Sequence, residues 1–150
     1  MHGRHVSLRA YNDALTHGSA VQMFAVVAGV VLSVLGIAAL IVNADFSTGS
    51  SLTAHHMVLF DVNGWSGVLY LVTGLATLSA AADAVRARRA AIFTGGLYMV
   101  LTVWSLIDGS IVGLLPVNDP TAVLYAAIGV IGIAAALEAG EPRRQAGRHA

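Results

Sequence analysis

The sequence predicts an all-α fold, a four-helix bundle that crosses a membrane as two parallel helical hairpins. Three observations predict it. The chain is 57% hydrophobic and only 11% charged, with a mean hydropathy of +0.76, whereas soluble domains average roughly 25% charged residues. Four long apolar segments alternate with short polar ones. One stretch of the chain also occurs twice.

The repeated stretch runs from Leu59 to Ala81 and again from Leu114 to Ala136. Each copy has a Val-Asn turn, then an apolar helix with a Tyr about two turns in and a Gly about one turn later. The matched pairs are Asn63 with Asn118, Tyr70 with Tyr125, and Gly74 with Gly129. Because the spacing is kept, we interpret the stretch as an internal duplication within one domain. The repeats cover about residues 21–82 and 90–137, and polar tails cover 1–20 and 138–150.

The first apolar segment, Val21–Val42, reaches roughly 33 Å as a helix, enough for a hydrocarbon core of about 30 Å. It is too long for the apolar part of a signal peptide, which is typically about 7–15 residues. The polar loop Asn43–His56 follows. The other three spans are expected at about Gly64–Ala82, Ala90–Ile107 and Pro120–Leu137.

The starts of the second and fourth spans carry helix-capping residues. Asn63 and Asn118 are each suited to accept hydrogen bonds from the free N–H groups of a first helical turn, and Pro120 fits that turn. Short apolar segments, Met57–Val62 and Ser110–Val117, precede these caps. They either dip into the bilayer or extend the neighbouring helices, and the sequence leaves both alternatives open.

The arginines predict the orientation, because positive residues stay on the cytoplasmic side. All eight basic residues are Arg, and the two loops that contain the repeated turns have none. Both termini and the middle loop are therefore expected inside a plasma (inner) membrane that the chain crosses several times. The main topology determinants are Arg86, Arg88, Arg89, Arg143 and Arg144.

The spans contain little that points to catalysis, so we expect neither enzymatic activity nor a cofactor. No ionisable acid, base or His lies within a predicted span, and no nucleophile–base pair, carboxylate dyad or phosphate loop is found. There is no Cys, and zero formal net charge gives no indication of nucleic-acid binding. His55 and His56 suggest a metal ligand pair, but adjacent side chains in an extended segment point apart. Otherwise they are interfacial histidines.

Tyr70 and Tyr125 are the candidate functional pair, with Gly74 and Gly129 beside them. In one interpretation the tyrosines line an outward-facing cavity between the repeats. In the other, their rings pack on glycine surfaces and their hydroxyls bond to carbonyls.

The repeated turn and its helix resemble an uncharacterised family of small four-helix actinobacterial membrane proteins, domain-of-unknown-function family 4383. The family's pattern is Asn, two variable residues, His, apolar residues, a second His and a Gly, and the resemblance covers roughly Val21–Leu137. Asn63 and Gly74 fit this pattern, as do Asn118 and Gly129. The His positions hold Ser66 and Thr121, then Tyr70 and Tyr125, so any role of those histidines is in doubt here. The resemblance implies an integral membrane protein and no assigned activity.

Three functions are compatible with these features. The first is a structural or accessory protein in the lipid bilayer that associates with itself or with another membrane protein. The second is a carrier or channel for a small or lipid-like molecule, with a cleft between the hairpins. The third is a metal- or redox-linked membrane enzyme, which only His55 and His56 support.

Overall fold

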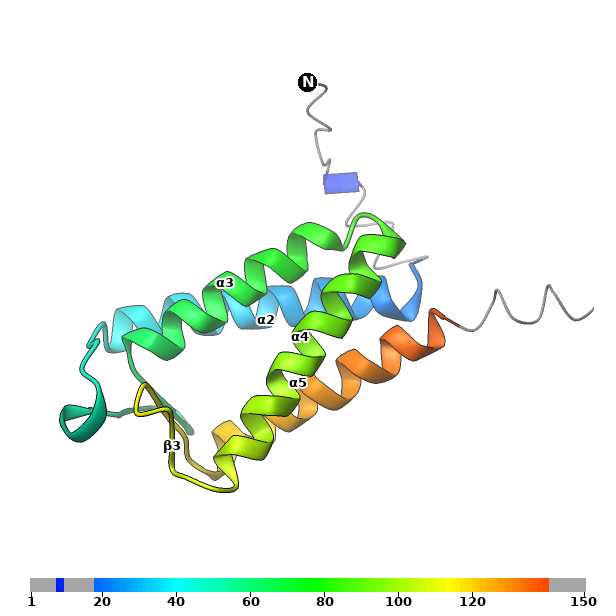
Figure 1. Ribbon diagram of the computed structural model, residues 1–150. Coiled ribbons are helices and arrows are strands. Elements are labelled where there is room, and N and C mark those ends of the chain that lie inside the picture. Colours follow the sequence, from blue (N-terminus) through cyan, green and yellow to red (C-terminus); the bar gives the residue numbers. More distant parts are fainter. Residues whose placement is uncertain (1–7, 10–17, 141–150) are drawn as a thin grey trace, which may run out of the picture.

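The computed structural model describes residues 8–9 and 18–140, and the chain there is mainly helical, as predicted. Helices α2 and α3 pack side by side as one helical hairpin, α4 and α5 form a second, and the two hairpins pack on each other (Figure 1). The long helices are α2 (Ala20–Val42), α3 (Gly64–Ala80), α4 (Ala84–Ser105) and α5 (Asp119–Glu138).

The connection between the hairpins is shorter than the sequence predicts. Asp83 caps α4 by accepting a hydrogen bond from the Arg86 backbone N–H at 2.9 Å. The helix therefore begins at Ala84, and the prediction that it begins near Ala90 is wrong. Arg86, Arg88 and Arg89 lie in its first turns because an acidic cap satisfies the free N–H groups and Arg is a good helix former.

The two apolar segments before α3 and α5 form β-hairpins and do not extend the neighbouring helices, so the fold is not purely α. Each hairpin has a non-glycine residue with positive φ in its turn, Val58 at 59° and Val112 at 55°, a conformation that β-branched residues rarely adopt. Antiparallel pairing joins the strands within each hairpin. The strands are β1 (His55–Met57), β2 (Phe60–Val62), β3 (Ser110–Ile111) and β4 (Leu115–Pro116).

Both β-hairpins lie at one end of the bundle, opposite the α3–α4 connection (Figure 1). One residue of each hairpin, Val62 in β2 and Ile111 in β3, is buried in the core. The loop after α2 contains the 3₁₀ helix η1 (Gly49–Ser51). It is tied to the second hairpin by a hydrogen bond from Gly49 N–H to the Gly113 carbonyl at 2.8 Å. The hairpins and this loop therefore form a continuous cap over one end of the four helices.

The opposite end is held by two corresponding contacts. The Gln22 side chain, at the start of α2, donates to the carbonyl of Ala81, just after α3, at 3.2 Å. Arg88, at the start of α4, donates from Nε to the carbonyl of Ala136, near the end of α5, at 2.9 Å. In each hairpin a long polar side chain on the first helix thus satisfies a carbonyl left unpaired at the end of the second.

Candidate functional site

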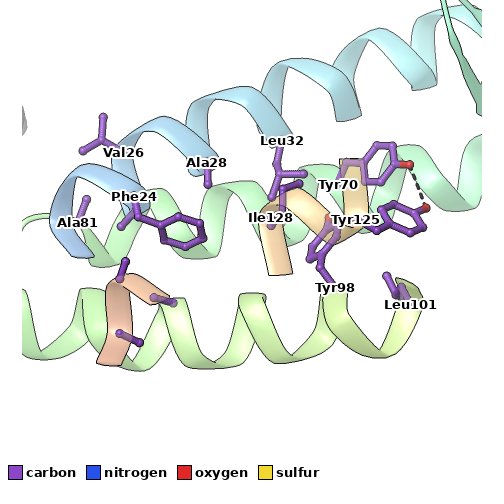
Figure 2. Close-up of a cluster of buried hydrophobic side chains, with 14 of the residues drawn as sticks. Phe24, Val26, Ala28, Leu32, Tyr70, Ala81, Tyr98, Leu101, Tyr125 and Ile128 are labelled. Atoms are coloured by element: carbon purple, nitrogen blue, oxygen red, sulfur yellow. Dashed lines mark hydrogen bonds between the residues drawn. The ribbon is translucent and has the colours of Figure 1, made fainter. Parts of the chain in front are cut away.

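The candidate site is the contact between the two hairpins, where Tyr70 of α3 meets Tyr125 of α5. Their hydroxyl oxygens lie 3.0 Å apart and share a hydrogen bond. The rings meet edge to face with centroids 6.2 Å apart (Figure 2). The structure therefore brings together the two tyrosines that the repeated stretch matched, although 55 residues separate them in the chain.

Neither tyrosine lines an open cleft. Tyr70 is 1% exposed and Tyr125 is 0% exposed, so the outward cavity that the carrier interpretation expects at this pair is not present in this structure. The packing interpretation describes the arrangement better, with one difference. The hydroxyls bond to each other and not to backbone carbonyls, because both buried side chains reach into the centre of the bundle from α3 and α5, which are not neighbouring helices.

A third tyrosine, Tyr98 of α4, completes the cluster. Its ring packs edge to face on Tyr125 with centroids 5.4 Å apart. Its hydroxyl donates to Thr73 Oγ1 at 3.0 Å, since Thr73 itself donates to the Leu69 carbonyl. Tyr98 has no matching residue in the repeated stretch, so the repeat does not point to it. The signal that could have found it is its hydroxyl group within an apolar span, since a buried hydroxyl requires a hydrogen-bond partner.

Another hydroxyl pair lies nearer the α3–α4 connection, where Thr77 and Thr94 are 2.7 Å apart. Both threonines are buried, as are Thr73 and Tyr98. Each of these hydroxyls has a hydrogen-bond partner, as buried polar groups require. All the partners found for them in residues 18–140 are hydroxyls or backbone carbonyls, so the cluster holds the helices together and contains no acid–base pair.

The capping asparagines also connect the hairpins. Asn63 Oδ1 accepts from the Ser66 N–H at 2.9 Å, which caps α3, while its Nδ2 donates to the Leu114 carbonyl at 2.7 Å. Asn118 Oδ1 accepts from the Thr121 N–H at 3.0 Å, which caps α5, while its Nδ2 donates to the Leu59 carbonyl at 2.9 Å. Each asparagine thus caps its own helix and also donates a hydrogen bond to the β-hairpin turn that precedes the other capped helix.

Gly74 and Gly129 are contact points within the hairpins and do not line a cavity. A Cβ atom on Gly74 would lie 2.5 Å from the Ser33 backbone nitrogen in α2. A Cβ atom on Gly129 would lie 2.7 Å from the side chain of Met99 in α4. The absence of a side chain therefore lets each helix of a pair approach the other closely.

The remaining candidate residues lie at the two ends of the bundle. Arg86 and Arg89 are exposed, whereas Arg88 is half-buried against α5. Arg143 and Arg144 lie outside the described residues. His55 and His56 are exposed on β1, and His56 Nδ1 lies 2.5 Å from Asp61 Oδ1 on the paired strand.

His56 and Asp61 have no third metal-binding side chain beside them in the described residues. Across residues 8–9 and 18–140, no three His, Asp or Glu side chains come together in a way suited to a metal ion. His56 and Asp61 face each other because they are directly opposite in the strand register, so their contact follows from the hairpin.

A comparison with protein families matches residues 22–137 to a family described as a domain of unknown function (DUF4383). The chain belongs to this family. The match covers all four long helices up to the last turn of α5, together with both β-hairpins. Searches of curated proteins and of solved structures found no match. The description of the DUF4383 family assigns no activity.

Proposed function

We propose that this DUF4383 protein is a four-span integral membrane protein with a structural or accessory role, which associates with itself or with another membrane protein. One observation carries the membrane assignment. Many of the side chains that face outward from the helices are large and apolar, whereas the hydroxyl groups near the middle of the spans are buried, those of Ser33, Thr73, Thr77, Thr94, Tyr70, Tyr98 and Tyr125. Outward-facing examples are Val34, Ile37, Val72, Phe93, Val100, Val123 and Ile131. This distribution is unfavourable in water and favourable in lipid.

Length supports two of the spans directly. Helices α2 and α5 are long and apolar enough to cross a membrane, with 23 and 20 residues. Helix α3 is shorter, and α4 begins with three arginines. Packing supports α3 and α4 as spans. Helix α3 lies along α2, with Gln22 meeting Ala81 at one end and Leu40 meeting Gly67 toward the other. Helix α4 lies along α5, with Arg88 meeting Ala136 and Met99 meeting Gly129, so each helix occupies the same depth as its long apolar neighbour.

The proposed orientation places both termini and the α3–α4 connection in the cytoplasm. Arg86, Arg88 and Arg89 lie at that end of the bundle, and positive residues remain inside. The β-hairpin cap then faces outward. This makes the two helical hairpins parallel repeats related by an axis along the membrane normal. The matching contacts of Gln22 and Arg88, and of Asn63 and Asn118, support the duplication.

A non-catalytic role fits the interior better than transport or catalysis. The buried hydroxyls are engaged with each other or with the backbone, and the tyrosine pair is closed to solvent. The bundle therefore presents mainly an apolar outer surface to its surroundings. In a membrane, such a surface contacts lipid or other helices, and small residues on it allow close helix contacts.

The membrane assignment is tested with introduced cysteines, which the natural chain lacks. Ser50→Cys in the loop after α2 should react with an impermeant maleimide in intact cells. Val85→Cys, exposed at the start of α4, should react only after the cells are permeabilised. Recovery of the chain in the soluble fraction, or labelling of both variants in intact cells, would contradict the proposed topology.

The accessory role needs a separate experiment. The chain, tagged at its C-terminus in its native host, is extracted in mild detergent, and its size and co-purifying proteins are measured. We expect a homo-oligomer or a stoichiometric complex with a membrane protein that also forms chemical cross-links to the chain in intact membranes. A solitary monomer at native expression would contradict this role.

A further inference from the structure

An apolar groove lies between α2 and α5. Its volume is about 570 Å³. Side chains of Met23, Phe24 and Val27 line one wall, and Ala127, Ile131 and Ala134 line the other. Every lining residue is apolar except Glu138, at the end of α5. The groove is therefore an apolar depression along the surface of the bundle, with one carboxyl group at its cytoplasmic end.

The groove exists because the two sides of the bundle are closed differently. Between α3 and α4, buried side chains bond across the interface, Thr73 to Tyr98 and Thr77 to Thr94. On the other side, the residue matched to Thr77 is Gly132, and the groove lining contributed by α2 includes Ala28. Both residues are shorter than Thr and have no hydroxyl. The three-residue connection also holds α3 and α4 together, whereas the start of α2 and the end of α5 are not joined.

The length of the groove fits one leaflet of a bilayer. It extends along α2 from Ala20 to Val31 and along α5 from Glu138 to Ala127, which is roughly 17 Å at about 1.5 Å per residue. Half of a hydrocarbon core of about 30 Å is about 15 Å. A transmembrane helix of a partner would cross both leaflets and leave half its length outside the groove. A single acyl chain of the inner leaflet would fill the groove end to end.

Charge at the cytoplasmic end indicates the kind of head group. Glu138 is exposed there, and it stands at the C-terminal, partially negative end of α5. Arg88 donates to the Ala136 carbonyl of the same helix end, but it does not line the groove. Ala20, in the first turn of α2, also lines the groove, at the partially positive end of that helix. The carboxylate of Glu138 is the one ionised side chain among the lining residues, and it is complementary to an ammonium group.

We propose that the α2/α5 groove binds one acyl chain of an inner-leaflet phospholipid whose head group carries a primary ammonium, with the ammonium beside Glu138. This inference rests on the proposed membrane location. It identifies the lipid partner of a specific surface, and it does not depend on whether the chain has an accessory role.

The test uses the full chain reconstituted into vesicles of phosphatidylethanolamine and phosphatidylglycerol in equal amounts, re-extracted in mild detergent and measured by native mass spectrometry. Wild type should retain one phosphatidylethanolamine. Ala134→Trp fills the groove and should lower that retention about tenfold, which a loss of about 1.4 kcal/mol produces. Ser79→Trp is the matched control, since Ser79 is exposed at the corresponding position of α3, outside the groove, and it should retain the lipid.

The variant Glu138→Gln distinguishes recognition of the head group from binding of the acyl chain. This exposed position is not part of the core, so the variant should fold, bind a phospholipid and lose its preference for phosphatidylethanolamine. Equal retention in Ala134→Trp and Ser79→Trp, or a wild-type preference for phosphatidylglycerol, would overturn the proposal. The proposal would also be overturned if Ala134→Trp lost self-association or a protein partner while it retained the lipid as well as wild type does. A chain that never enters the vesicles would instead refute the membrane location itself.

Discussion

The hydroxyl groups of Tyr70 and Tyr125 are each other's hydrogen-bond partners, 3.0 Å apart in the buried contact between the two helical hairpins. Neither hydroxyl has another partner among the hydrogen bonds of the described chain. The pair is therefore a closed unit, and its two members should contribute to stability as a unit. This property can be measured directly.

Replacing either Tyr70 or Tyr125 by Phe should destabilise the bundle by about 1–3 kcal/mol, because the remaining hydroxyl is left buried and unpaired. Replacing both should cost less than the sum of the single changes, since no unpaired hydroxyl remains. A double-mutant cycle of unfolding free energies in detergent micelles measures the difference. Strictly additive effects would show that the two hydroxyls do not depend on each other.

Asn63→Ser separates the capping role of the residue from its contact with the other hairpin. Serine is also a good cap, but it lacks the side-chain amide group with which Asn63 donates to the Leu114 carbonyl. We expect a loss of about 1–3 kcal/mol, because Asn63 is fully buried. Asn118→Ser, at a more exposed contact, should cost less, about 0.5–1.5 kcal/mol. Thermal unfolding followed by circular dichroism provides the comparison, and a reversed order would contradict the assignment.

Glycine-to-alanine changes test the close helix contacts. Gly74→Ala should be strongly destabilising, because the new Cβ meets the backbone nitrogen of Ser33, which cannot move away without shifting the helix. Gly129→Ala should cost less, because its nearest neighbours are side-chain atoms of Met99, a flexible residue.

Gly96→Ala is the control for these changes. Apart from the neighbouring backbone of α4 itself, no atom lies within 4 Å of a Cβ placed there, so the substitution should stabilise α4 by about 0.5–1 kcal/mol through helix propensity alone. If all three variants lost the same free energy of unfolding, the interhelical contacts would not be the cause.

The loop after α2 should respond to acid through Asp45. A hydrogen bond from the Thr53 hydroxyl and another from the Ser47 N–H lower the pKa of the Asp45 carboxyl below its ordinary value of 3.8. A carboxyl with a lowered folded-state pKa stabilises the folded loop above its unfolded pKa and loses that contribution as pH falls through the folded value. The loop should therefore remain ordered down to about pH 4 and loosen below it.

Trp65 reports on this transition, because its indole N–H donates to the Phe46 carbonyl at 3.0 Å and its ring packs on Phe46. Its fluorescence, measured in a Trp104→Phe background, should change at acid pH in the wild-type loop. Asp45→Asn keeps an acceptor and cannot titrate, so it should abolish the change. An unaltered transition in that variant would assign the effect to another group.

The position and kind of the four helices follow from local features of the sequence. Apolar runs of sufficient length are helical, and Asn63 and Asn118 stand where the free N–H groups of α3 and α5 need acceptors. The early start of α4 was missed because charged residues were assigned to a loop, although Asp83 is as good a cap as Asn63. The repeated spacing also indicated the Tyr70 and Tyr125 pair before any contact was known.

The sequence by itself determined the helices, their caps and the apolar character of the surface, because these depend on residues a few positions apart. Only the tertiary structure decided the contacts between distant segments. It placed Tyr98 on Thr73, joined Asn63 to the carbonyl of Leu114 and folded two apolar segments into β-hairpins. It also left a groove between α2 and α5. Such features arise from the depth and angle at which whole helices pack, and no local pattern encodes these.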